Sequence, residues 1–258
     1  MIYLATNCDK DFYNTKPDRI IKSLLEYKSE NMEIMFFQID FDEKIDGIIN
    51  VNVPLEKIKE SKRFDIENRP WFVCLETGEF VNFYNFNDDD ILILLDYDII
   101  QQRYFNDYEI NLVKNIKDGE FYLTKNSFTD DRNSHSEMNI LCIDMSLNED
   151  KEPFEIYNTG CQIAKISTWK KMYEFYKKIH LKWEEKCKHH ATGQLIFNYI
   201  AYENDMIKEL HPSFHSSWGF HGLKHFTRNK KFYVHTDGNM DNGLLVLFNH
   251  HVWNNDFL

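Results

Sequence analysis

The 258-residue sequence has few glycines and prolines, no long basic run and no long apolar run. Its 9 Gly and 5 Pro are too few for a collagen-like or low-complexity chain. No apolar run approaches the roughly 20 residues of a membrane-spanning helix, and no leader with a basic start and an apolar core opens the chain. The net charge of −12, without a basic run, disfavours nucleic-acid binding. An acidic cleft that recruits a divalent cation fits this charge better.

Cysteine is also sparse and follows no pattern. The 5 cysteines are odd in number and form no Cys-x-x-Cys pair, so free buried thiols are expected rather than disulfides. No Asn-x-Ser/Thr acceptor for N-glycosylation occurs either. Together with the missing leader, these features predict a reducing, cytoplasmic setting. The cysteines are Cys8, Cys74, Cys142, Cys161 and Cys187.

Hydrophobic residues make up 43% of the chain, which predicts a sizeable buried core. The first part of the sequence has a β-α-β pattern. Strands are predicted over residues 2–6, 33–40 and 48–53, and a helix is predicted to start at Pro17. This order predicts a Rossmann-like sheet in an α/β domain.

The rest of the chain continues to alternate between strand and helix patterns. A hairpin is predicted where residues 71–75 and 80–83 flank Gly78. Ser167 is a good N-cap for an amphipathic helix, and a second helix is predicted to begin near Thr192. No linker rich in Pro, Gly or Ser divides the chain, which predicts one domain. The remaining predicted elements are a helix over 107–117 and strands over 121–123, 140–144, 232–236 and 244–248.

The most apolar run of the chain, residues 91–95 (ILILL), ends abruptly in Asp96-Tyr97-Asp98. A continuous run of this length predicts a central strand buried on both faces. Because alternate side chains of a strand point the same way, both carboxylates should face one ligand at its carboxyl end, where open α/β sheets bind ligands. Two carboxylates there suit Mg²⁺ or Mn²⁺, with a diphosphate supplying further oxygens. The alternative is a solvated strand end, since Asp is common in turns.

Four segments carry a resemblance to a known family. Residues 91–103 (ILILLDYDIIQQR) resemble the Asp-x-Asp strand of GT-A-fold glycosyltransferases. Residues 158–160 (NTG) are similar to the Asn-Ala-Gly segment of glycosyltransferase family 8, and residues 194–198 (QLIFN) to its Asp-Gln-x-x-x-Asn stretch. Residues 232–238 (FYVHTDG) resemble its C-terminal strand ending in His-x-x-Gly. The segments occur in the family's order and span most of the chain.

The resemblance implies a GT-A-type α/β fold, with a Rossmann-like mixed central sheet flanked by helices in one domain over residues 1–258. Residues 1–100 would form the nucleotide-binding half that ends in the Asp-x-Asp motif. Residues 101–258 would form the acceptor-side half, with an irregular C-terminal region rich in His and aromatic residues.

The implied activity is metal-dependent transfer of a sugar from a nucleoside-diphosphate sugar, a UDP-sugar above all, to a hydroxyl of a glycan or other acceptor. Retention of anomeric configuration is slightly favoured. The resemblance implies that Asp96, Asp98 and His235 hold Mn²⁺ or Mg²⁺, with His221 and His250 as alternatives to His235. It places the nucleotide at Tyr3, Ala5, Thr6, Asn7, Asp96, Tyr97 and Asp98.

Three further residues are candidates for contacts with the reacting sugars. Asn158 would direct its amide at the donor sugar or acceptor, although an Asn before Gly is equally typical of a plain turn. Gln194 would contact the anomeric region of the donor, or else be a solvated helix residue. Asp130 lies in a stretch that reads as a solvated loop, but it could approach the acceptor as a general base.

The sequence departs from the family pattern in two places. Gly193 stands where the family has the Asp before Gln194. Residues 239–243 replace the Lys-Pro-Trp that usually follows His-x-x-Gly, so Lys224 or Arg228 would have to meet the diphosphate.

An array of histidines raises the possibility of a zinc site. Because Pro212 and Gly219 interrupt any helix there, a loop with interleaved aromatic residues is the favoured interpretation. The array consists of His211, His215, His221 and His225.

Two other functions remain open. A metal-dependent nucleotidyltransferase also uses paired Asp residues, but the Gly-Ser step typical of that class does not precede Asp96. A non-catalytic carbohydrate-binding module would use the aromatic-rich tail and would need neither Asp96 nor Asp98.

Overall fold

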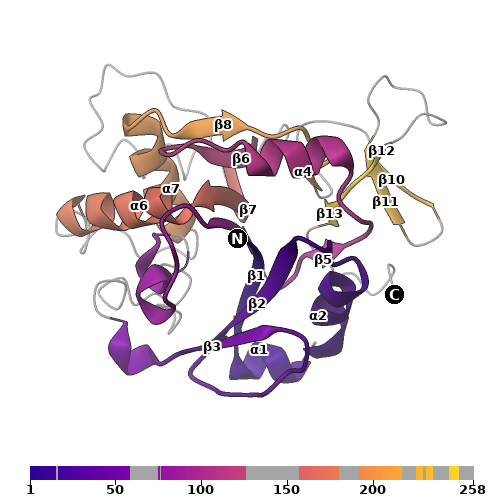
Figure 1. Cartoon of the computed structure of the whole chain (residues 1–258), viewed down its shortest axis with the longest axis horizontal. Coiled ribbons are helices and arrows are strands. Elements are labelled where there is room, and N and C mark those ends of the chain that lie inside the picture. The colour runs from indigo at the N-terminus through magenta and orange to yellow at the C-terminus, as the bar shows by residue number, and fades with distance from the viewer. Residues whose placement is uncertain are drawn as a thin grey trace.

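The computed structural model describes residues 1–15, 17–58, 75, 77–125, 157–179, 192–216, 225–228, 231–234 and 244–249. Its centre is a seven-stranded sheet with the strand order β3-β2-β1-β4-β7-β6-β8 (Figure 1). These strands are β1 (Ile2–Asp9), β2 (Met32–Ile39), β3 (Ile49–Val53), β4 (Ile91–Leu95), β6 (Phe121–Lys125), β7 (Tyr157–Lys165) and β8 (Ile207–Glu209).

The helices are α1 (Lys10–Thr15), α2 (Pro17–Glu26), α4 (Asp107–Lys114), α6 (Ile166–Ile179) and α7 (Thr192–Glu203), with 3₁₀ turns η1 (Leu55–Lys57) and η3 (Glu79–Phe83). Two small three-stranded sheets have the orders β10-β11-β12 and β5-β13-β9. Their strands are β5 (Ile100–Gln101), β9 (His215–Ser216), β10 (His225–Arg228), β11 (Lys231–Val234), β12 (Leu244–Leu245) and β13 (Phe248–Asn249). No helix in the described part of the chain is long and apolar enough to cross a membrane.

The central sheet is mixed. Strands β3, β2, β1 and β4 are parallel, β7 runs antiparallel to β4 and β6, and β8 is parallel to β6. All five residues of β4 are buried, as expected for a continuous apolar run covered on both faces. The first and second halves of the chain therefore share one sheet, and β4 is its centre.

Helices cover both faces of the sheet. The larger core lies between the sheet and α6, α7 and η3, and α2 and α4 pack on the opposite face (Figure 1). Trp169 of α6 is fully buried and packs edge-on against Phe80 and Phe121, with ring centroids 5.0 and 4.7 Å apart. Gly78 adopts φ +85°, and a Cβ there would lie 2.7 Å from the Trp169 carbonyl oxygen. Glycine at this position therefore allows η3 to approach α6 closely.

Most predicted elements are confirmed with shifts of a few residues at their ends. The hairpin prediction is wrong on its second side, because residues 79–83 form η3 after the left-handed Gly78. Ser167 does not cap α6, which begins at Ile166. The predicted strand over 244–248 is divided into β12 and β13, because the Leu247 amide donates to the Ser213 carbonyl between them (2.8 Å). The predicted strand over 140–144 lies outside the described residues.

Candidate active site

Buried polar side chains gather at one edge of the sheet, where β1, β4 and β6 end and β7 begins. We call this the carboxyl edge. Such groups cost free energy when buried unless they find partners, so their concentration marks a functional or strongly bonded region. The buried polar residues at this edge, or bonded to it, are Thr6, Asn7, Thr124, Asn158, Thr159, Asn198 and His215.

The Asp-Tyr-Asp motif lies on a turn at this edge. Strand β4 ends at Leu95, and the Ile99 amide donates to the Asp96 carbonyl oxygen (3.2 Å). Strand alternation is therefore not what positions the two acids, contrary to the prediction. Tyr97 is only 4% exposed, whereas Asp96 and Asp98 on either side of it are partly exposed. The buried tyrosine leaves the two flanking carboxylates nearer the surface.

The neighbouring strands and an aromatic cluster hold this turn. Asn7 of β1 donates its side-chain amide to the Leu95 carbonyl (3.2 Å), and the Asp96 amide donates to the Gly160 carbonyl of β7 (2.9 Å). The Tyr97 ring stacks on Phe36, with centroids 5.8 Å apart. The backbone of the turn is thus bonded on both sides and packed from within.

Two buried thiols lie near the turn. Burial raises the pKa of the Cys161 thiol well above its ordinary value, and the negative charge of Asp96 raises it further. Burial likewise raises the pKa of Cys8. The hydrogen bond with Tyr97 lowers this pKa, but its effect is smaller than that of burial. Both thiols are free and fully buried.

The start of β7 is clamped by α7. The Asn198 side chain accepts from the Tyr157 amide (2.8 Å) and donates to the Tyr157 carbonyl (2.9 Å) and the Gln194 carbonyl (2.8 Å). Thr159 donates its hydroxyl to the Gln194 side-chain oxygen (3.2 Å), and the Asn158 side chain accepts from the Gly160 amide (2.8 Å). Gln194 is thereby joined to the clamp through Thr159 and Asn198, whereas the Asn158 side chain bonds the backbone of its own segment, as an Asn before Gly in a turn does. The predicted contacts of Asn158 and Gln194 with sugars stay predictions.

Asn198 is the most extensively bonded member of this network, and sequence reasoning assigned it no role. It is fully buried. Its spacing of four residues from Gln194 places both on one face of α7, which is the signal that would have found it.

The four β1 residues predicted to contact the nucleotide divide into two pairs. Thr6 and Asn7 are buried at the carboxyl edge, and the Thr6 hydroxyl has no hydrogen-bond partner. Tyr3 and Ala5 lie deeper, in the core. The Tyr3 ring packs against Tyr84 and Phe86, and burial and the charge of Asp90 raise the pKa of Tyr3 to about 12. Sequence reasoning did not single out Gln162 of β7. Its side chain is 1% exposed, and its amide nitrogen has no hydrogen-bond partner.

The histidine array does not form one helical face in the part that is described. His211 lies in a turn, where its ring bonds the Ser213 hydroxyl (2.8 Å), and His215 lies in β9. The buried His215 ring bonds the Thr124 hydroxyl at 2.8 Å, which ties β6 to β9. Among the residues that the structure describes, no group of three or more His, Cys, Asp or Glu side chains is placed to hold a metal ion.

Several predicted site residues lie outside the described residues. These are Asp130, His235 and its alternatives His221 and His250, together with Lys224. Nearby backbone is described, however. Val234, which precedes His235, pairs with Leu244, and the Leu245 carbonyl accepts from the Arg103 guanidinium (3.0 Å). The C-terminal strands are thereby linked to the segment that follows the Asp-Tyr-Asp turn.

Solved structures resemble this chain over nearly its whole length. The galactosyltransferase LgtC, in complex with donor and acceptor sugar analogues, matches with a TM-score of 0.62 and 13% identity, covering 98% of this chain and 90% of that one. The chain has the GT-A fold. An active-site mutant of LgtC matches with a TM-score of 0.60, 11% identity and the same coverages of 98% and 90%. Mouse xyloside xylosyltransferase 1 matches with a TM-score of 0.57 and 11% identity, over 84% of this chain and 88% of that one.

No protein-family model matches the sequence, and no curated protein matches it significantly. The GT-A fold confirms the predicted architecture of a mixed sheet flanked by helices. The Asp-Tyr-Asp turn and the start of β7 lie at one edge of this sheet, joined by the bond from the Asp96 amide to the Gly160 carbonyl.

Proposed function

We propose that the protein is a glycosyltransferase that moves a sugar from a nucleoside-diphosphate sugar to an acceptor hydroxyl, with a divalent cation at Asp96 and Asp98. The observation that carries this proposal is the acid-Tyr-acid turn at the carboxyl edge of a GT-A sheet, bonded to β1 and β7 on either side. Ligands of open α/β sheets bind at this edge. The glycosyltransferases among the structural neighbours support sugar transfer.

The donor atoms near the turn fit a hard cation. Two partly exposed carboxylates suit Mn²⁺ or Mg²⁺, because both ions prefer oxygen ligands. We propose His235 as the third protein ligand, because the strand that leads to it is linked through β12 to Arg103. Such a cation would neutralise the charge that develops on the leaving diphosphate.

The chain's own residues then have separate roles in the proposed reaction. Asn7 holds the turn by its bond to the Leu95 carbonyl, and the buried Thr6 hydroxyl beside it has no partner in the described structure, so we propose it as a contact of the nucleotide once the site is occupied. Asn158 and Gln194 lie on the β7 side, where we place the sugar. A UDP-sugar donor, retention of configuration and a cytoplasmic location complete the proposal. The free thiols of Cys8 and Cys161 support the last of these.

A panel of nucleotide-sugars tests the proposal. Each donor is mixed with the protein and Mn²⁺, and binding is scored by thermal shift and turnover by release of nucleoside diphosphate. We expect one donor to stabilise the protein and to release diphosphate only while the cation is present, with EDTA abolishing the release. Pyrophosphate release from a nucleoside triphosphate would instead show a nucleotidyltransferase. Sugar binding without any nucleotide or metal response would show a binding module.

A further inference from the structure

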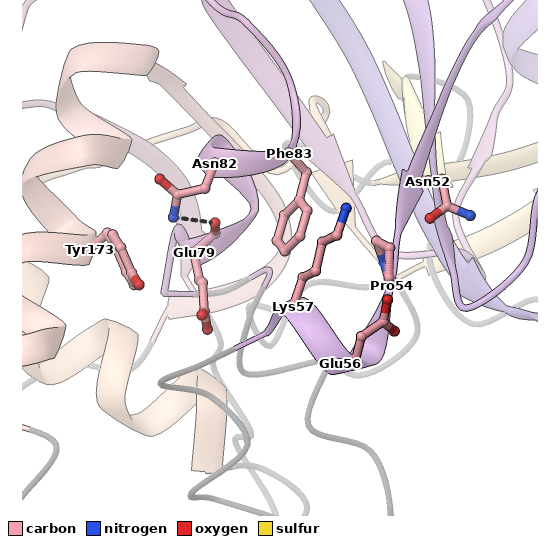
Figure 2. A pocket seen from close by; sticks show the side chains of 8 residues that line it. All are labelled: Asn52, Pro54, Glu56, Lys57, Glu79, Asn82, Phe83 and Tyr173. Carbon is pink, nitrogen blue, oxygen red and sulfur yellow. Dashed lines mark hydrogen bonds between the residues drawn. The ribbon is translucent and has the colours of Figure 1, made fainter.

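A hollow lies beside the edge strand β3, away from the Asp-Tyr-Asp turn. It has a volume of about 800 Å³, within the usual range of small-molecule sites. One wall is formed by the end of β3 and η1, with Asn52, Pro54 and Lys57. The other wall is formed by η3 and α6, with Phe83 and Tyr173 (Figure 2).

Both walls are fixed by the surrounding structure. On the β3 side, Asn52 donates to the Phe41 carbonyl (2.7 Å), and the Lys57 amide donates to the Pro54 carbonyl (2.9 Å). On the opposite side, η3 is held against α6 by the contact of Phe80 with Trp169. The hollow is therefore formed before any ligand arrives, which lowers the entropic cost of binding.

The lining combines an aromatic ring with polar groups of both signs. Phe83 is only partly buried and lies beside the Lys57 side chain in the middle of the hollow (Figure 2). The Lys177 ammonium covers one face of Tyr173, 4.8 Å from the ring centroid, which leaves Phe83 as the platform for a ligand. Glu56 is the exposed acid of the lining and stands next to the exposed Lys57, whereas Glu79 is buried with its own interactions.

The exposed charges of the described lining are balanced, with one carboxylate at Glu56 and one ammonium group at Lys57, so no excess of positive charge favours an anion. A neutral polyhydroxyl ligand can bond the Glu56 carboxylate, the amides and the ammonium group, and lay its apolar C–H face on Phe83.

We propose that this hollow binds a neutral sugar residue of a glycan, separately from the site of transfer. Strand β3 is three strands from β4, which separates it from the Asp-Tyr-Asp turn by roughly 14 Å at ordinary strand spacing. In the strand order, β1 lies between the hollow and β7, where the transferred sugar is placed, so the hollow is a distal sugar subsite apart from the acceptor. The choice of a sugar among polyhydroxyl ligands rests on the proposed glycosyltransferase function.

Binding of neutral disaccharides tests the proposal without nucleotide or metal. Lactose, maltose, cellobiose and chitobiose are titrated in EDTA and followed by saturation-transfer NMR and calorimetry. We expect millimolar binding of at least one, weakened about tenfold in Phe83→Ala by loss of the stacking surface. Lys57→Ala, a change at an exposed residue, should weaken it roughly threefold by loss of one hydrogen bond. Tyr108→Ala, which removes an aromatic ring that is 71% exposed on α4, should leave binding unchanged.

A double variant, Asp96→Asn with Asp98→Asn, separates this proposal from the proposed function. It should keep wild-type sugar binding while losing diphosphate release from the donor. If the double variant loses sugar binding as well, the sugar occupies the transfer site and the distal subsite is refuted. Failure of every disaccharide to bind the wild type, or equal binding by wild type, Phe83→Ala and Lys57→Ala, would also refute it. Failure of donor turnover alone would leave sugar binding intact and count only against the proposed function.

Discussion

Strand β4 carries acidic residues at both ends, and the two ends use them differently. At its amino end, each acid of Asp88-Asp89-Asp90 has a cationic partner: Lys170 (2.5 Å), Lys165 (3.1 Å) and the N-terminal ammonium group (2.8 Å), respectively. At its carboxyl end, Asp96 and Asp98 flank the buried Tyr97 on a turn held by backbone bonds.

The comparison shows that acidic residues alone do not mark a site. The amino-end lysines come from the end of β7 and from α6, so the next elements along the sheet supply the neutralising charge. At the carboxyl end, β7 instead contributes the Gly160 carbonyl, which accepts from the Asp96 amide. The Gly160 amide donates in turn to the Asn158 side chain. At that end, hydrogen bonds from both neighbouring strands and the packing of Tyr97 on Phe36 fix the turn that carries the two acids.

The largest expected effect compares one acid from each end. We expect Asp98→Ala to lower diphosphate release from the donor by roughly 10²- to 10³-fold, because a charge-stabilising group at the reacting centre is lost. Asp89→Ala, whose side chain is 94% exposed at the amino end, should retain wild-type activity. Initial rates at saturating Mn²⁺ measure both variants, and circular dichroism checks their folding. Full activity of Asp98→Ala would refute the assigned metal site.

The second effect concerns the clamp on β7. Asn198→Ala leaves the Tyr157 amide and carbonyl without their side-chain partner in a buried place, so the free energy of unfolding should fall by about 2–3 kcal/mol. Asn204→Ala is the matched control just after the end of α7, because Asn204 is exposed and donates one hydrogen bond to the Ile200 carbonyl. It should cost less than about 0.5 kcal/mol. Urea unfolding compares the two, and equal losses would show that the clamp does not stabilise the fold.

The third effect is the pH dependence of stability that the Asp90 ion pair gives at the amino end of β4. Burial alone would raise the pKa of Asp90, but hydrogen bonds from the N-terminal ammonium group and Asn87 lower it below its usual 3.8. A carboxyl whose pKa is lowered on folding stabilises the protein above its unfolded pKa, and this contribution is lost as the pH falls through the folded pKa. The stability difference between wild type and Asp90→Asn should thus be about 1 kcal/mol near pH 6. It should shrink below pH 3.8, and a difference independent of pH would exclude the ion pair as its cause.

The sequence allowed the central part of the fold to be predicted, but only part of the site. Residues 91–95 are apolar without interruption, and such a run has few other structures available in an α/β chain. The position of Asp96 and Asp98 at its end followed directly. Their placement on a turn could not be predicted in this way. Alternation describes how side chains point along a strand, and it gives no sign of the bond from the Ile99 amide that closes the turn.

Other parts of the site depend on contacts between distant residues. Thr124 and His215 are 91 positions apart, and nothing local to either residue indicates their hydrogen bond. The hairpin prediction failed for a related reason, because Gly78 is required by its approach to Trp169, a residue of a distant helix. A glycine needed for such tertiary packing has the same sequence appearance as one needed for a tight turn.

The smallest effect compares two buried threonines at the carboxyl edge. The Thr6 hydroxyl has no partner, so Thr6→Val should leave the free energy of unfolding unchanged or raise it by up to about 1 kcal/mol. Thr124→Val removes the partner of the buried His215 ring and should cost about 1–2 kcal/mol. If the Thr6 hydroxyl contacts the nucleotide, Thr6→Val should also raise KM for the donor several-fold, with little change in kcat. A Thr6→Val variant that is strongly destabilised, or that keeps an unchanged KM, would show that this hydroxyl belongs to the folded core and not to the donor site.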